Sequence, residues 1–186
     1  MRSRFKVLGH PAHPILVVFP LGLYPIALFC DIIFLALFFG FGTLDGFWWR
    51  MAFWSLIFGA VGTLMAALPG LIDYLNIPTD APAKRTASFH LITSMFIVIL
   101  TLSSIVLRNW GDAPHTLNFG PTTSIFYIAI LLNVFLNMLL PFQGWLGGHL
   151  VYAHGIGVES SDKIDPIATM VGEDEPRSEP ARRVVG

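Results

Sequence analysis

Four stretches of the sequence are each long and apolar enough to cross a lipid bilayer as a helix. They span residues 14–39, 48–75, 86–107 and 122–145. A helix needs about 20 predominantly apolar residues to cross the hydrocarbon core. The stretches are continuous instead of alternating and are longer than barrel strands, which disfavours a transmembrane β-barrel. The expected fold is therefore all-α, an integral membrane four-helix bundle.

The composition is that of a membrane protein whose main partner is the lipid bilayer. Hydrophobic residues make up 54% of the chain and charged residues only 12%, and the mean hydropathy is +0.67. These values are far from those of soluble domains. We expect a cytoplasmic N-terminal segment (residues 1–13), a transmembrane domain (residues 14–158) and a polar tail (residues 159–186). The tail should be disordered because it has little apolar surface to bury. No nucleic-acid-binding surface is indicated.

The Lys and Arg residues predict how the helices are oriented. Of the 11 basic residues, only Arg50 and Arg108 fall at one end of the apolar stretches, and the others fall at the opposite end or in the tail. Basic residues that flank transmembrane helices are concentrated on the cytoplasmic side. We therefore expect both termini in the cytoplasm and the bundle in a bacterial inner membrane.

One acidic residue, Asp31, lies deep inside the first apolar stretch. An unpaired charge at this position would cost at least about 2.5 kcal/mol in a bilayer. Arg50 and Arg108 belong to the same leaflet and are the candidate partners. A structural ion pair, or a protonated and hydrogen-bonded carboxyl group, is favoured over a role in proton transfer.

Most of the histidines are expected at the cytoplasmic ends of the helices. With the helices threaded in this way, one membrane face receives an ionisable set made of His10, His13, Asp73, His90, His149 and His154. His13 is suited to cap the first helix, with Pro14 as its first residue. His90 lies about one helical turn inside the membrane. His115 falls in the opposite loop and is interpreted as a solvated residue.

This ionisable set can support several kinds of chemistry. Imidazoles at a membrane interface can ligate haem iron or a divalent metal, carry protons, or lie in the polar headgroup layer. The spacing matches no zinc signature such as His-Glu-x-x-His. The single Cys30 is expected to pack as a small apolar residue. An enzyme is disfavoured, because no Ser or Cys lies beside the histidines in the arrangement of an activated nucleophile.

The histidines belong to longer motifs that span residues 10–158. These motifs are His10-Pro-x-His13-Pro14, Phe19-Pro20, Gly70-Leu-Ile-Asp73-Tyr74-Leu-x-Ile77-Pro78, His90 and Gly147-Gly148-x-Leu150-Val-Tyr152-x-His154-Gly155-x-Gly157-Val158. Together they resemble a bacterial family of small four-helix membrane proteins known as domain of unknown function 2231. Members of that family are sometimes fused to cytochrome c-like or Rieske-like domains, which implies a place in electron transfer and a redox partner protein. The resemblance includes His10, His13, His90 and His154, whereas the position of His149 is more often another polar residue.

Three functional hypotheses follow from these observations. The first is a membrane protein that binds b-type haem or a metal for electron transfer. Haem would have His90 as its first ligand and His13 or His154 as its second, with His10 as a further candidate. A divalent metal would instead draw its ligands from His10, His13, His90, His154 and Asp73. The second hypothesis is a non-enzymatic structural membrane subunit whose polar cap ties the helix ends together. The third is a small transporter, for which a kinked first helix and Asp31 argue. No oligomeric state is specified.

Overall fold

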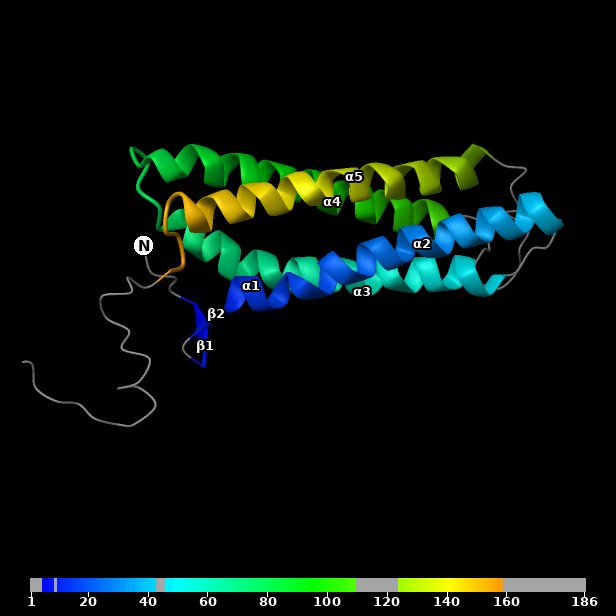
Figure 1. Cartoon of the computed structure of the whole chain (residues 1–186), viewed down its shortest axis with the longest axis horizontal. Coiled ribbons are helices and arrows are strands. Elements are labelled where there is room, and N and C mark those ends of the chain that lie inside the picture. The colour runs from blue at the N-terminus through cyan, green and yellow to red at the C-terminus, as the bar shows by residue number, and fades with distance from the viewer. Residues whose placement is uncertain (1–4, 9, 43–45, 110–123, 159–186) are drawn as a thin grey trace, which may run out of the picture.

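The computed structural model is a bundle of four long helices that run side by side (Figure 1). The structure describes residues 5–8, 10–42, 46–109 and 124–158. Within these ranges, four helical spans are long and apolar enough to cross a membrane. The predicted all-α membrane bundle is thus confirmed. The predicted solvated His115 and the predicted disordered tail lie outside the described residues.

A short hairpin precedes the helices along the chain. The elements are β1 (Lys6–Val7), β2 (His10–Pro11), α1 (Ala12–Leu16), α2 (Val18–Phe41), α3 (Gly46–Leu75), α4 (Pro82–Asn109) and α5 (Ser124–Tyr152). The two strands are antiparallel, and Lys6 pairs with Pro11 while Val7 pairs with His10. Helices α1 and α2 together form the first membrane span.

The first span begins earlier than predicted. Helix α1 starts at Ala12, so His13 lies inside the helix and does not cap it. Pro11 occupies the cap position and makes no side-chain hydrogen bond there. The amide of Ala12 donates to the carbonyl oxygen of Phe5 at 3.0 Å. The hairpin therefore satisfies an amide at the helix start that has no partner within the helix.

A break divides the first span, and the last helix is longer than expected. The break falls at Val17, in agreement with the predicted kink. Pro20 has no N–H with which to bond the carbonyl group of Leu16, which favours an interruption at this point. Helix α5 continues to Tyr152, beyond the predicted end at residue 145, because its glycines near the C-terminal end do not interrupt the helix.

The helices associate as two pairs, α2 with α3 and α4 with α5 (Figure 1). On α3, the small residues Gly62, Ala66 and Gly70 face the first span. A Cβ atom at Gly62 would lie only 3.0 Å from the side chain of Phe19. These small residues thus allow the two backbones to approach closely.

Apolar side chains fill the interior of the bundle and also cover its outside. The central cluster includes the fully buried Tyr24 and Leu136. An aromatic cluster of Phe34, Trp49 and Phe126 fills the end opposite to the hairpin. Large apolar residues are exposed on all four spans. Such an outer surface is expected of a protein whose solvent is lipid.

Candidate functional site

Two of the predicted site histidines, His13 and His90, meet near the hairpin end of the bundle. His13 comes from α1, which lies beside α3, and His90 comes from α4, which lies beside α5. The ring centroids are 6.1 Å apart, and the ring planes make an angle of 77°. Both residues are half-buried. The contact therefore connects the two helix pairs.

Helix α3 fixes the orientation of the His13 ring. Its Nδ1 atom lies 2.8 Å from the carbonyl oxygen of Ala66. A carbonyl oxygen only accepts hydrogen bonds, so Nδ1 carries the proton. Gly70 leaves room for the ring, because a Cβ atom there would lie 2.9 Å from Nδ1. In the neutral imidazole, Nε2 is then the nitrogen that can accept a hydrogen bond or bind a metal.

Polar groups of α4 and α5 surround His90. The amide nitrogen Nε2 of Gln143 lies 3.1 Å from His90 Nε2 and 3.2 Å from the His90 carbonyl oxygen. It also donates to Ser94 Oγ, and Ser94 donates to the His90 carbonyl oxygen at 2.8 Å. Gly147 packs on the ring edge, because a Cβ atom there would lie 3.4 Å from Cε1. The ring is thus held against α5.

This arrangement leaves His90 Nδ1 and Gln143 Oε1 buried without a hydrogen-bond partner in the described part of the chain. An unpaired buried polar group costs about 1–3 kcal/mol. If the amide donates to His90 Nε2, the imidazole proton is on Nδ1 and finds no acceptor. If the amide is reversed, Nε2 donates to Oε1 and Nδ1 keeps an unpaired lone pair, but Oε1 then faces the His90 carbonyl oxygen, which also only accepts hydrogen bonds. In the second case Nδ1 is able to ligate a metal.

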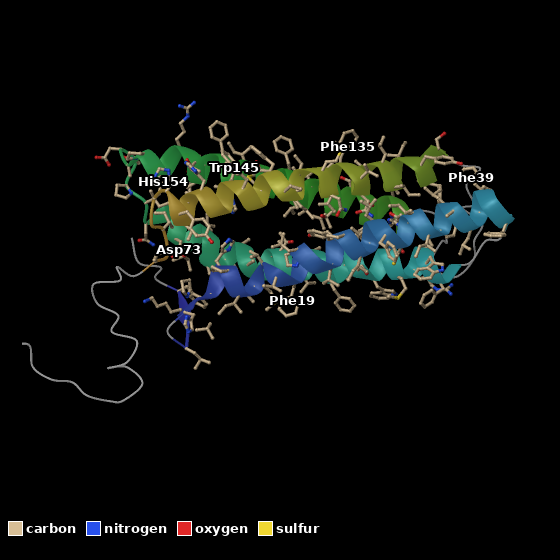
Figure 2. The ribbon with its side chains drawn as sticks, in the orientation of Figure 1. Phe19, Phe39, Asp73, Phe135, Trp145 and His154 are labelled. Carbon is tan, nitrogen blue, oxygen red and sulfur yellow. The ribbon has the colours of Figure 1, made fainter. Side chains whose placement is uncertain are left out.

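The other predicted site residues lie at the same end of the bundle but outside this contact. His149 and His154 form a second pair, with ring centroids 5.2 Å apart, and His149 also stacks on Trp145. His10 is exposed on β2, and Asp73 is half-buried near the end of α3 (Figure 2). Across residues 5–8, 10–42, 46–109 and 124–158, no group of three or more His, Cys, Asp or Glu residues could hold a metal ion. The residues of the predicted ionisable set therefore do not form one site: His13 contacts His90, His149 contacts His154, and His10 and Asp73 lie outside both contacts.

A buried charged network lies on the other side of the central cluster. Arg108 Nη2 donates to Asp31 Oδ2, and Asn133 Nδ2 donates to the same oxygen at 2.8 Å. The side chains of Asp31 and Arg108 are both 0% exposed. The ion pair predicted for Asp31 is confirmed, and Arg108 is the partner. Arg50, the other candidate, is exposed.

Further contacts extend this network over all four spans. Arg108 Nε donates to Ser104 Oγ at 3.3 Å, and its guanidinium group lies 4.2 Å from the centre of a Trp49 ring. The side chain of Asn137 donates to Asn133 Oδ1 at 3.0 Å and to a carbonyl oxygen of α2 at 3.2 Å. The two asparagines therefore share one helix face. The network is a second connection between the helix pairs.

Gln143 and Ser94 are site residues that the sequence patterns do not identify. Both lie in apolar helices, where a polar side chain can equally bond to its own helix backbone or to a neighbouring helix. The available signal is an amide side chain at Gln143, one turn before Gly147 in α5. That signal becomes informative only when the register of α5 against α4 is known.

A family comparison covers the histidines and the helices together. The model of the family described as predicted membrane protein (DUF2231) matches residues 9–160, which include every described helix. No curated protein and no solved structure matches the chain. Because the family match extends over most of the 186 residues, the chain belongs to the predicted membrane protein family DUF2231.

Proposed function

We propose that His13 and His90 hold one redox-active metal centre, with b-type haem iron as the first candidate, and that the protein passes electrons within the membrane. The observation that carries this proposal is the pair itself. Two imidazoles, one from each helix pair, meet at a centroid distance of 6.1 Å. Helical bundles bind haem and metals through side chains that project inward from facing helices.

The separation of the rings agrees with ligation of one shared metal. A bond between a metal and an imidazole nitrogen is about 2.0 Å long, and the ring centre lies roughly 1.1 Å beyond that nitrogen. Two imidazoles that hold one metal would therefore have centres no more than about 6 Å apart. The angle of 77° between the planes is compatible with this, because rotation about a metal–nitrogen bond does not change the separation.

The surroundings of both rings also suit ligation. A ligating histidine usually donates its other N–H group to a carbonyl or carboxylate oxygen. His13 does so through Nδ1 to Ala66, which leaves Nε2 for a metal. His90 Nδ1 lacks a hydrogen-bond partner among the described residues, and it would be able to ligate a metal in the tautomer in which Nε2 carries the proton. His90 can alternatively offer Nε2 if the side chain of Gln143 moves aside.

Haem is preferred to a bare ion because His13 and His90 would be the two protein ligands that haem iron takes, and the described residues offer no third His, Cys, Asp or Glu beside them for a bare ion. Bound haem would supply one-electron transfer at its iron. The chain's own contribution is to hold the two rings, with Gly70 and Gly147 leaving room for the rings themselves. The apolar bundle would tune the redox potential through its low polarity. A redox partner protein is part of this proposal.

Spectra and metal contents of the purified protein test the proposal. A Soret band with one haem per chain supports haem, and a bound transition metal without a Soret band supports a bare ion. No binding after loading with haemin, Cu²⁺ or Zn²⁺ contradicts both versions. His13→Ala and His90→Ala should each remove the bound centre. His149→Ala is the matched control and should keep it, because His149 contacts His154 instead.

A second candidate function is that of a non-enzymatic membrane subunit whose buried polar contacts hold the helices together. It is favoured by the observation that the ion pair between Asp31 and Arg108 joins α2 to α4. Under this alternative, neither the wild type nor His90→Ala would bind a cofactor. His90→Ala would lower the free energy of unfolding by about 1–3 kcal/mol, because Gln143 would lose a partner.

A further inference from the structure

The β1–β2 hairpin carries an unusual apolar residue in its turn. Leu8 lies between the paired residues Val7 and His10, its φ angle is 51°, and 94% of its surface is exposed. Tight hairpin turns require positive φ angles, which favour Asn or Gly and disfavour bulky side chains. In water, neither the backbone conformation nor the exposure of this residue favours leucine.

The hairpin projects sideways from the end of the bundle, across the helix axes (Figure 1). Membrane-spanning helices run at only a modest tilt from the membrane normal, so the hairpin lies roughly in the membrane plane. Phe19 is 60% exposed on the side from which the hairpin projects (Figure 2). Because this side of a membrane span faces lipid, the hairpin extends over lipid.

The hairpin is also fixed to the helix that it precedes. The amide of Ala12 donates to the Phe5 carbonyl oxygen at 3.0 Å, and Lys6 pairs with Pro11, the residue directly before α1. Only a few residues separate Leu8 from the start of the first span. The turn therefore lies at the depth where the span enters the bilayer.

We propose that the hairpin is a membrane-interface anchor whose apolar side chains insert among the lipid headgroups and the upper acyl chains. Phe5 and Val7, each 48% exposed, add to the apolar surface of Leu8. Insertion removes this surface from water and accounts for leucine in a turn that disfavours it. The anchor sets the depth at which α1, with His13, enters the membrane. It does not depend on a bound cofactor.

Spin labels on the hairpin test the anchor directly. Leu8→Cys and Val7→Cys are prepared separately in a Cys30→Ala background, labelled, and reconstituted into phosphatidylcholine vesicles. Collision rates with oxygen, which concentrates in lipid, and with a water-soluble nickel chelate report the depth of each label. Asp80→Cys is the control, because Asp80 is exposed in the loop between α3 and α4 at the same end of the bundle.

The anchor predicts an oxygen-to-nickel ratio several-fold higher at the Leu8 and Val7 positions than at the Asp80 position. Equal ratios at the hairpin and control positions would overturn the proposal. Labels on the hairpin that are shielded from both reagents would overturn it too, because they would indicate coverage by protein. The helical circular dichroism of each variant shows whether it is folded, and two independent hairpin positions guard against a local effect of one label.

Discussion

Asp31→Leu should lower the free energy of unfolding of the bundle by about 3–5 kcal/mol, the cost of removing one partner from a buried ion pair. The substitution would leave Arg108 without its carboxylate partner, and the Arg108 side chain is 0% exposed. A guanidinium group does not lose its proton in a protein, so a buried positive charge would remain. Its contacts with Ser104 and with the Trp49 ring offset only part of that cost.

Two further variants separate the cost of leaving one charge unpaired from the cost of losing the whole ion pair. Arg108→Met should cost less, about 1–3 kcal/mol, because the Asp31 carboxyl group can take up a proton and keeps its hydrogen bond from Asn133. The double variant Asp31→Leu/Arg108→Met should lie within about 2 kcal/mol of the wild type. Apolar replacement of a whole buried ion pair often costs little, and the main loss is the acceptor of Asn133.

The assay is reversible unfolding in mixed micelles titrated with dodecyl sulfate and followed by tryptophan fluorescence. Arg50→Met is the control, because Arg50 is exposed and lies toward the same end of the bundle. The reasoning is refuted if Asp31→Leu is no more destabilising than Arg50→Met. It is also refuted if the cost of the double variant equals the sum of the two single costs.

Three more predictions follow from packing, charge distribution and composition. In the same unfolding assay, Gly59→Ala should destabilise the protein by about 1–3 kcal/mol, because a Cβ atom there would overlap the buried Tyr24 ring. Gly22 has open space around it, so Gly22→Ala should be neutral or stabilising. Reporter fusions after Gly42 and Asp112 should read periplasmic and a fusion at residue 82 cytoplasmic, and a periplasmic reading at residue 82 would reverse the threading. Deletion of the polar tail should leave membrane insertion and thermal stability nearly unchanged, and a large loss of either would show that the tail docks on the bundle.

The sequence predicts the helices well because each span must satisfy its own backbone in lipid. It also predicts that Asp31 needs a partner, because burial of a lone charge is costly. The choice between Arg50 and Arg108 depends on which side chain points into the bundle: Arg50 belongs to α3, which packs along α2, but it is exposed, whereas Arg108 of α4 is buried. That arrangement arises from packing between distant helices and has no local pattern in the sequence.

The contacts of the candidate site were likewise only partly predictable from the sequence. His13 and His90 are identifiable as a potential pair because both belong to helix ends at one membrane face. The separation of His154 from them is not predictable, because it depends on α5 continuing through its glycines to Tyr152. The hairpin is also missed by sequence patterns, since leucine occupies a turn position where Asn or Gly is the usual signal.

The spin state of ferric haem in the loaded protein tests most directly whether His13 and His90 share one metal. Two imidazole ligands give low-spin iron, which electron paramagnetic resonance distinguishes from the high-spin iron expected with one such ligand. We expect a low-spin signal in the wild type and in His149→Ala, and high-spin iron or loss of haem in both His13→Ala and His90→Ala. Absence of haem binding by the wild type would contradict the haem version of the site, and a low-spin signal that persists in either variant would contradict the sharing of one metal by both histidines.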